Sequence, residues 1–326
     1  MDVVVVSDGM LPTPAKGTGG LQAMAHALCS LFISWGHRVT LVGAAGSSLE
    51  GGEVVEACEP RWDLSTEEQL LAAAERLNWD VLLDISHYHL TALRHPSNSV
   101  ILHQDGGPVD PHPRTVFISK AQRARLGAGW VIRNRIPALL PVLAEPDPDL
   151  AIFMGNIVPH KGADRAIHLA RRAGMRLWIC GQILDASFGA KILSMVGDGM
   201  TYVGPVAGDE KARVLSRAAV AFCTPCAGLG FYFEPAQIVA VEAASVGTPV
   251  LAADFGGLPE YILPDTGRTG ANIKELLEKL PECLALPRER VREAARAFLL
   301  ETAAEAWRLV LEAAATGQPL EADVCV

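Results

Sequence analysis

The sequence lacks any apolar run that approaches the roughly 18 residues of a membrane-spanning helix. It also lacks a recognisable secretory leader, because Met1 is followed at once by Asp2 and by a run of valines that predicts a strand. Hydrophobic residues nevertheless make up 50% of the chain, a share that predicts large cores in a compact protein. We therefore expect a cytoplasmic protein without an integral membrane segment.

An excess of positive charge is also missing. The formal net charge is −9 at pH 7, so we do not expect the surface as a whole to attract nucleic acid or anionic membranes. No Gly-x-Gly-x-x-Gly run follows the first predicted strand, which argues against a nicotinamide-dependent dehydrogenase.

A set of cysteines that could form a disulfide framework is also missing. The chain has seven cysteines, an odd number, and only Cys223 and Cys226 lie close together, so no disulfide framework is implied. These two have the spacing of a redox motif, but no second pair accompanies them to complete a zinc site. We expect neither a metal site nor a redox role for them.

Short apolar runs rich in β-branched residues alternate with helical patterns along most of the chain. Such runs are typical of parallel strands buried on both faces, and their alternation with helices predicts doubly wound α/β sheets that bind ligands beyond the carboxyl ends of the strands. A length of 326 residues suggests two domains. We predict two Rossmann-like domains facing a cleft, at residues 1–143 and 150–288.

Prolines separate the two sets of strands. Pro137, Pro141, Pro146 and Pro148 interrupt residues 136–150, and we interpret this stretch as a linker that forms neither regular helix nor central strand. A long helical pattern follows the second set and predicts one helix over 289–316. We expect a frayed tail at 321–326.

Two places in the first set have the features of ligand contacts. Gly19 and Gly20 lie where a helix is predicted to begin, and glycines there let backbone N–H groups approach an anion, although a plain turn is the alternative. His103 ends a predicted strand and precedes a glycine-containing loop, although a histidine at a strand end is often structural. For the His-Tyr-His run at 87–89, a loop with surface aromatics is favoured over contact with an acceptor.

The stretch from 233 to 252 predicts a loop, a helix, a tight turn and a buried strand. Pro235 suits the first helical position and Gly247 the C-terminal cap. On one helix, Glu234 and Glu242 would be about 12 Å apart along the axis and about 80° apart around it, so both carboxylates could touch one extended ligand. The alternative is that Glu234 only caps the helix and Glu242 pairs with a buried arginine.

This Glu-x7-Glu spacing, followed by the Gly-Thr-Pro-Val run at 247–250 and the Gly-Gly-Leu-Pro-Glu run at 256–260, resembles the retaining glycosyltransferases of family 4, which have the GT-B fold. The segment 155–162 is similar to the family's Gly-Arg-x3-4-Lys-Gly motif. The resemblance spans nearly the whole chain and is most specific from 201 to 270. It also implies that the C-terminal helix crosses back to the first domain.

The resemblance implies roles for the residues at matching positions. Glu242 would hold the ribose of a sugar nucleotide, Glu234 would lie beside the donor sugar, and Lys161 would neutralise the donor diphosphate, unless it is a solvated residue at a helix start. Val203 would lie beside the base, with a plain buried strand residue as the alternative. The other implied contacts are those of His103 with donor sugar and acceptor, and of Gly19 and Gly20 with donor phosphate and acceptor.

Two departures from the family pattern bear on activity. Asn156 stands where the family has arginine, which removes a bidentate phosphate donor. The leaving group is then stabilised less, or another group such as Lys120, Arg165 or His160 compensates. An Ala-Gln-Ile run that includes Gln237 replaces the usual Phe-Gly-Leu, and we interpret Gln237 as an added contact to the sugar.

The resemblance predicts a retaining hexosyltransferase that moves a sugar from a UDP- or GDP-linked donor to a hydroxyl of a sugar or other small acceptor. No cofactor is expected. A metal is not expected either, because Lys161 and the helix dipole near Ala236 would stabilise the leaving diphosphate, and the one Asp-x-Asp run, at 147–149, lies in the predicted linker. The open alternatives are a GT-B sugar-nucleotide epimerase and a catalytically weak sugar-nucleotide binding protein, which Asn156 makes credible.

Overall fold

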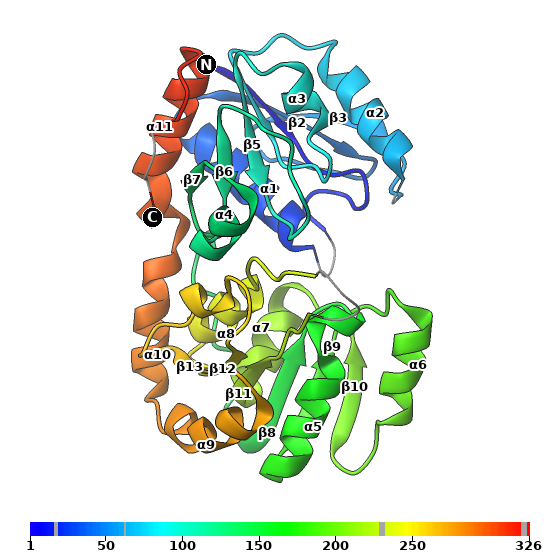
Figure 1. Ribbon diagram of the computed structural model, residues 1–326, viewed down its shortest axis with the longest axis vertical. Coiled ribbons are helices and arrows are strands. Elements are labelled where there is room, and N and C mark those ends of the chain that lie inside the picture. Colours follow the sequence, from blue (N-terminus) through cyan, green and yellow to red (C-terminus); the bar gives the residue numbers. More distant parts are fainter. Residues whose placement is uncertain (16–18, 62, 228–231, 321–324) are drawn as a thin grey trace. The chain divides into compact units, whose positions relative to one another are not determined.

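Two compact units make up the structure, a computed structural model that describes residues 1–15, 19–61, 63–227, 232–320 and 325–326. The first unit comprises Met1–Pro137 and Leu300–Val326, and the second unit comprises Ala138–Leu299. The points where the chain changes units therefore differ from the predicted positions 143 and 289. Each unit contains one parallel sheet with helices (Figure 1), so the predicted α/β class is confirmed.

The sheet of the first unit has seven parallel strands in the order β3-β2-β1-β4-β5-β6-β7. Its inner strand β1 carries the run of valines, which is buried because neighbouring strands flank it and helices cover the sheet. The strand order reverses between β1 and β4, the kind of switch point beyond which doubly wound sheets bind ligands. The elements are β1 (Asp2–Val6), α1 (Gly20–Ser34), β2 (Arg38–Ala44), β3 (Glu53–Cys58), α2 (Leu64–Ala74), β4 (Val81–Asp84), α3 (Leu90–Arg94), β5 (Ser99–His103), β6 (Thr115–Phe117), α4 (Lys120–Leu126), β7 (Trp130–Val131), η4 (Leu300–Ala303) and α11 (Ala304–Ala315).

The sheet of the second unit has six parallel strands in the order β10-β9-β8-β11-β12-β13. Its order reverses between β8 and β11, so a second switch point lies at the centre of this sheet. The elements are β8 (Asp147–Met154), η1 (Pro159–Lys161), α5 (Ala163–Ala173), β9 (Arg176–Cys180), α6 (Ala186–Ser194), β10 (Met200–Gly204), α7 (Gly208–Arg217), β11 (Ala218–Cys223), α8 (Ile238–Ser245), β12 (Val250–Ala253), η2 (Leu258–Tyr261), β13 (Gly267–Gly270), α9 (Ile273–Leu284), α10 (Arg288–Ala294) and η3 (Ala295–Phe298).

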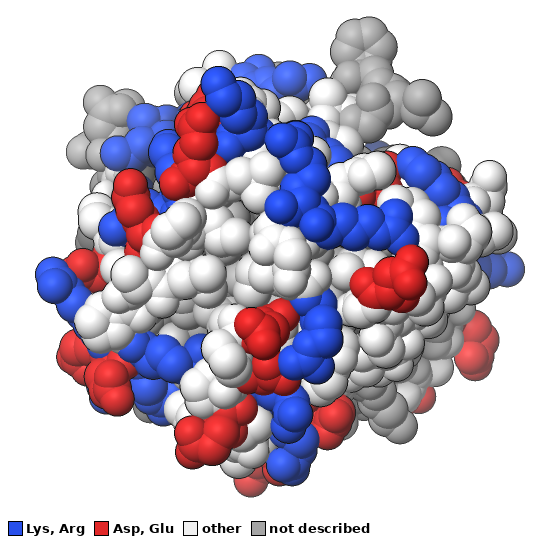
Figure 2. All heavy atoms as spheres, turned by 90° about the horizontal axis from the view of Figure 1, so that it is seen from below, with Lys and Arg blue, Asp and Glu red and all other residues white. Residues whose placement is uncertain are grey.

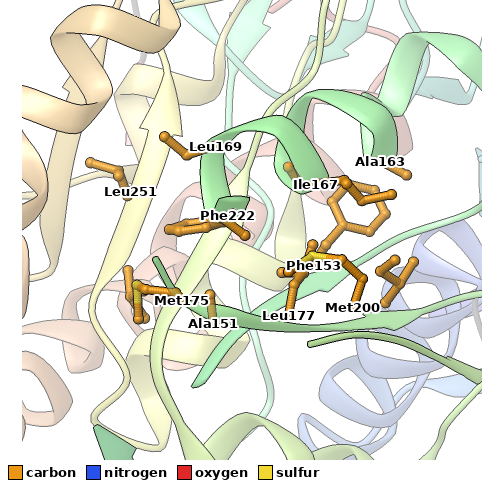
Figure 3. Packing of buried hydrophobic residues seen from close by; sticks show 14 of the residues in the cluster. Ala151, Phe153, Ala163, Ile167, Leu169, Met175, Leu177, Met200, Phe222 and Leu251 are labelled. Atoms are coloured by element: carbon orange, nitrogen blue, oxygen red, sulfur yellow. The ribbon is translucent and has the colours of Figure 1, made fainter. Parts of the chain in front are cut away.

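The largest core cluster of the second unit lies between α5 and the sheet. Apolar residues recur at helical spacing in α5, and Ile167 and Leu169 are fully buried. Figure 3 shows them above Phe153 of β8 and Phe222 of β11. Full burial of one such side chain contributes about 1.5–3 kcal/mol, and this packing anchors the loops that follow β8 and β11.

The predicted linker is partly wrong, because β8 begins at Asp147 and is a central strand. A register shift explains how it includes Pro148. The pairing with β11 passes from Asp147 directly to Ala151, and the pairing with β9 begins only at Leu150. Pro148 therefore lies where neither neighbouring strand needs its missing N–H.

The single C-terminal helix predicted over 289–316 is also wrong. The pattern is divided into α10, two short 3-10 turns and α11, with an extended residue at Leu299. At this break the chain leaves the second unit, and the N–H of Leu300 donates to the carbonyl of Ile136 in the first unit. Of the predicted frayed tail, residues 321–324 lie outside the described residues, whereas Val326 exchanges backbone hydrogen bonds with Val131 and Arg133.

Two properties of the surface bear on possible partners. Within the described part of the chain, no helix combines the length and the apolar character of a bilayer span. On the face drawn in Figure 2, Lys and Arg residues are interspersed with Asp and Glu.

Candidate functional site

Three predicted donor-side residues form one cluster in the second unit. Lys161 ends the turn η1 after β8, and its Nζ lies 2.6 Å from Oε2 of Glu234. Gln237 donates from Nε2 to the same oxygen at 3.1 Å. The Glu234 side chain is only 2% exposed, whereas that of Lys161 is 23% exposed. A carboxylate this deeply buried requires such donors, and the ammonium keeps one accessible side for an anion.

Glu234 does not belong to the helix that follows it. The helix α8 begins at Ile238 rather than at Pro235, and Gln237 is its N-terminal cap residue. No side chain in the described ranges caps it. The predicted spacing between Glu234 and Glu242, which assumed that both lie on one helix, is therefore wrong. The alternative in which Glu234 caps the helix is wrong as well. Gly247 does follow the end of α8 with φ of 83°, as predicted.

Two glycines fix the backbone around this cluster. Gly256 has φ of 63°, and a Cβ atom there would lie 2.0 Å from the carbonyl oxygen of Glu234, which accepts a hydrogen bond from the N–H of Gly257. Gly162, next to Lys161, has φ of 75°, and its Cβ would lie 1.9 Å from the carbonyl oxygen of Thr224. Only glycine fits both positions. Close backbone packing thus holds Lys161 and Glu234 from two sides.

Glu242 lies on α8 and forms a second ion pair. Its Oε1 accepts from Nζ of Lys211 on α7 at 2.8 Å, and the two side chains are 13% and 22% exposed. The buried arginine that the sequence offered as its alternative partner is replaced by this lysine. The pair orients the Glu242 side chain while part of it stays accessible.

Asn156 follows β8, and Val203 lies on β10, both in the second unit. The side-chain oxygen of Asn156 is buried and has no hydrogen-bond partner in the ranges that the structure describes. Val203 on β10 is 39% exposed, so the alternative of a plain buried strand residue is wrong. Beside it, the hydroxyl of Tyr202 donates to the carbonyl of Gly181 at 2.8 Å and fixes the edge of the sheet.

His160 does not replace the charge of the missing arginine. Burial, with a smaller effect from Lys161, lowers its pKa to about 4, so the ring is neutral near pH 7. It stacks on Tyr232, with ring centroids 3.8 Å apart and an interplanar angle of 26°. Lys161 is therefore the charged residue of this motif.

Neither cysteine chemistry nor the Asp-x-Asp run contributes to the cluster. Cys223 is buried, and burial raises the pKa of its thiol to about 12. Asp147 begins β8 and pairs with Arg176 at 2.5 Å. Among the described residues, no three His, Cys, Asp or Glu side chains are grouped to hold a metal ion.

In the first unit, Gly19 and Gly20 lie at the start of α1. Gly19 precedes the helix, and a Cβ atom on it would lie 2.6 Å from Oε1 of Gln22. Asp8 lies just beyond the end of β1, and Nε2 of Gln22 donates to both of its carboxylate oxygens at 2.7 Å. Among the residues that the structure describes, no side chain caps α1. The residues immediately before Gly19, at 16–18, lie outside the described residues.

His103 ends β5 as predicted and is almost completely buried, with 1% exposure. Its Nδ1 lies 3.0 Å from Nε2 of His89, and its Nε2 lies 3.0 Å from the carbonyl oxygen of Gly107. Burial, together with the neighbouring His89, lowers the pKa of His103. The ring is therefore a neutral group with both nitrogens engaged.

The loop at 87–89 differs from the predicted loop with surface aromatics. Tyr88 is 50% exposed, but His89 is 2% exposed and faces His103. The His87 ring lies between carboxylates, 3.6 Å from Asp8 and 3.5 Å from Asp105. Burial alone would lower the pKa of His87, but Asp105 and Asp8 outweigh it and raise the pKa.

Lys211 and Asp84 were not identified from the sequence. Lys211 is separated from Glu242 by 31 positions, and no motif surrounds it. Asp84 does end a predicted strand next to the histidine run, and a carboxylate at the end of a wholly apolar strand is a signal that could have marked it.

Known proteins resemble both the sequence and the fold. Residues 140–298 match the family described as "Glycosyl transferases group 1". A GDP-mannose-dependent monoacylated alpha-(1-6)-phosphatidylinositol monomannoside mannosyltransferase of Corynebacterium glutamicum is 26% identical over 93% of this chain and 80% of its own length. A D-inositol 3-phosphate glycosyltransferase of Streptomyces avermitilis is 32% identical over 65% of this chain.

The match spans only part of several relatives. It covers 44% of the Streptomyces avermitilis protein, and 40% of an alpha-maltose-1-phosphate synthase of Mycolicibacterium smegmatis that is 29% identical over 43% of this chain. Among solved structures, AviGT4, a glycosyltransferase involved in avilamycin A biosynthesis, is 25% identical, with a TM-score of 0.82 over 98% of this chain and 100% of that one. Anabaena HepE in complex with UDP and glucose shares the fold, with a TM-score of 0.71 over 96% of this chain and 14% identity. The chain thus has the GT-B fold expected from the sequence.

Proposed function

We propose that this chain, whose residues 140–298 match the family of glycosyl transferases group 1, transfers a hexose from a nucleotide diphosphate sugar to an acceptor hydroxyl with retention of anomeric configuration. The observation that carries the proposal is the cluster of Lys161, Glu234 and Gln237. It presents a partly exposed ammonium beside a buried carboxylate, next to the uncapped start of α8.

The donor is assigned to the second unit. Lys161 and the first N–H groups of α8 bind the diphosphate, because an ammonium and a helix N-terminus both favour negative charge. Glu242 accepts hydrogen bonds from the ribose hydroxyls, and Val203 lies beside the base. Since HepE was solved with UDP and the corynebacterial relative is named for GDP-mannose, UDP- and GDP-linked hexoses are the first donors to test.

The transfer breaks the bond between the anomeric carbon and the diphosphate oxygen, whose electron pair leaves with the diphosphate. The acceptor oxygen forms the new bond on the same face of the sugar, and its proton passes to the leaving phosphate oxygen. Lys161 stabilises the charge that develops on this oxygen, so the step needs no metal. With Asn156 in the arginine position and His160 neutral, more of this stabilisation depends on Lys161.

The acceptor side is assigned to the first unit. Gly19 and Gly20 offer close backbone approach at the start of α1, and His103 ends β5 beyond the switch point of the sheet. We assign these residues to the acceptor hydroxyl and the transferred sugar. Gln237 supports the site by holding Glu234, and its added contact to the sugar stays a prediction.

A panel of UDP-, GDP-, ADP- and dTDP-linked hexoses tests the proposal. The protein is incubated with each donor and a set of sugar acceptors, and released nucleotide, product and anomeric configuration are measured by chromatography and proton NMR. Glycoside formed with retention supports the proposal. Epimerised donor would assign a sugar-nucleotide epimerase instead. Binding without turnover would assign a binding protein, the alternative that Asn156 in place of the family's arginine makes credible.

A matched pair of lysine variants tests whether the cluster around Lys161 is the donor site. Lys161→Ala should abolish most transfer, whereas Lys191→Ala should leave it unchanged. Lys191 makes an ion pair of the same 2.6 Å length with Asp164 in the same unit, but its side chain is 54% exposed. Equal activity of the two variants would remove Lys161 from the site.

A further inference from the structure

The imidazole rings of His89 and His103 form a buried pair in the first unit. Nε2 of His89 lies 3.0 Å from Nδ1 of His103, with ring centroids 5.3 Å apart. The two residues are 2% and 1% exposed. They come from the start of α3 and the end of β5, which belong to adjacent strand-helix segments of one sheet.

Oxygen atoms determine where His103 carries its proton. Its Nε2 lies 3.0 Å from the carbonyl oxygen of Gly107 and 3.4 Å from Oδ1 of Asp105. Asp105 Oδ1 itself accepts from the N–H of Gly107. A carbonyl and a carboxylate only accept, so Nε2 must donate. Because burial keeps the ring neutral, Nδ1 then holds a lone pair and must accept from His89.

His89 is held in place for this donation at a conformational cost. Its backbone has φ of 53° and ψ of 30°, and it is one of two non-glycine residues with positive φ in the described part of the chain. Such strain persists only where the surroundings impose it, and it concentrates at functional sites. Ser86 Oγ accepts from the N–H of His89, and the His89 carbonyl accepts from the N–H of Leu93.

Asp84 lies behind the pair. Its Oδ1 is 3.7 Å from Nδ1 of His89, which is too long for a hydrogen bond. Among the residues described, this Nδ1 has no hydrogen-bond partner. Asp84 is fully buried and is fixed by Ser86 and the N–H of Ala92. The carboxylate therefore faces the outer edge of the His89 ring, with its charge directed at that ring.

We propose that His89 is a positioning residue that holds His103 as the tautomer with its proton on Nε2, so that His103 serves as a hydrogen-bond donor and not as a base. The inference rests on the proposed function in one respect: the oxygen that receives the N–H during turnover belongs to the transferred sugar or the acceptor. In the structure the Gly107 carbonyl occupies the place of that oxygen. Asp105, with its side chain 41% exposed, marks the solvent side of this edge.

The tautomer is measured directly on the full chain. Two-bond proton-nitrogen correlation spectra of the ¹⁵N-histidine-labelled protein distinguish a protonated Nε2 from a protonated Nδ1 on each ring. We expect the Nε2–H form for His103, with the Nδ1 resonance shifted as in a hydrogen-bond acceptor. A protonated Nδ1 on His103 in the unmodified protein overturns the inference, whether or not the protein turns over a sugar nucleotide.

Three variants then distinguish a positioning role of His89 from a purely structural role. His89→Leu removes the donor, so the His103 Nδ1 resonance should move towards that of an unbonded ring nitrogen and kcat should fall about tenfold with KM for the donor nearly unchanged. His89→Gln keeps a side-chain N–H and should restore both. His95→Gln is the control, because His95 is a histidine of the same unit paired with Glu75 instead. An Nδ1 resonance unchanged in His89→Leu contradicts the inference, whereas the expected resonances without turnover would refute only the proposed transfer.

Discussion

Nζ of Lys161 and Oε2 of Glu234 are 2.6 Å apart, and nearly all exposure of the pair belongs to the lysine. A phosphate can therefore approach only the accessible side of the ammonium, while the carboxylate restrains its position. Because an ammonium carries three donors, Lys161 can keep its bond to Glu234 and still bind a phosphate oxygen.

Replacing this lysine should weaken diphosphate binding selectively. We expect Lys161→Ala to lose about 1.5–3 kcal/mol of affinity for UDP or GDP, the range for a hydrogen bond to a charged group, with a much smaller loss for uridine or guanosine. Isothermal calorimetry with nucleoside and nucleoside diphosphate measures both. The exposed Lys191→Ala is the control, and an equal loss for both ligands would mean that Lys161 does not contact the phosphates.

The ribose contact of Glu242 has its own signature. Glu242→Ala should weaken nucleotide binding by about 1–3 kcal/mol, and it should also erase any preference for UDP over 2′-deoxy-UDP, because the lost partner is a sugar hydroxyl. Calorimetry on the four combinations of protein and ligand separates this effect from a general loss. If the folded variant still distinguishes the two ligands as the unmodified protein does, Glu242 is not the ribose ligand.

Chelation should leave transfer intact. The charge on the leaving diphosphate is assigned to Lys161 and to the start of α8, and neither requires a divalent ion. Rates measured after dialysis against EDTA should match the untreated rate within experimental scatter. A rate lost in EDTA and recovered with Mg²⁺ or Mn²⁺ would contradict this assignment.

The two parallel sheets could be predicted because their signals are local. The valines of β1 and the alternation of strand and helix patterns are read within short windows, and they indicated the α/β class of both sheets, although β13 was not predicted and β8 begins within the predicted linker. The helical pattern after 289 was local too, but it could not show the interruption at Leu299. That interruption depends on Leu300 donating to Ile136, which is distant in the sequence.

In the candidate site, too, local motifs were predictable from the sequence and long-range contacts were not. The motifs identified Lys161, Glu234 and Glu242, but not how they are held. The position of Glu234 depends on a close contact with Gly256, and Lys211 reaches Glu242 from another helix. Long-range contacts of this kind leave no periodic signal in a single sequence. They also explain why the proline rule placed the start of α8 too early, since the segment before Ile238 is held by tertiary contacts.

The contact at Gly256 can be tested by stability. Gly256→Ala adds a Cβ atom 2.0 Å from the Glu234 carbonyl oxygen, at φ of 63°. Gly36→Ala has the same kind of strain, with φ of 83°, but its Cβ would meet nothing within 4 Å. We expect about 1 kcal/mol of destabilisation for Gly36→Ala and at least about 3 kcal/mol for Gly256→Ala, because the loop must move. Urea unfolding measures both, and equal losses would show that the loop yields without cost.

Stability should also fall as the pH is lowered below neutrality, and His112 provides the clearest case. Burial lowers its pKa from 6.5 to about 4. Its Nδ1 accepts from the N–H of Arg114, and its Nε2 lies 3.1 Å from Ser99 Oγ. Below pH 6.5 the unfolded chain takes up a proton that the folded ring refuses until the pH nears 4, so the unfolded state binds more protons and the free energy of unfolding decreases across this window.

Other groups act in the same window, so the test is a difference between variants. The lowered pKa of His103 adds to the loss, whereas the raised pKa of His87 opposes it. His112→Gln removes the titration while keeping an N–H that can reach Ser99, and His168→Gln changes an exposed histidine as the control. The decrease in Tm between about pH 7 and about pH 5 should be smaller in His112→Gln than in the unmodified protein and unchanged in His168→Gln. The same decrease in all three proteins would show that His112 is protonated equally in the folded and unfolded chain.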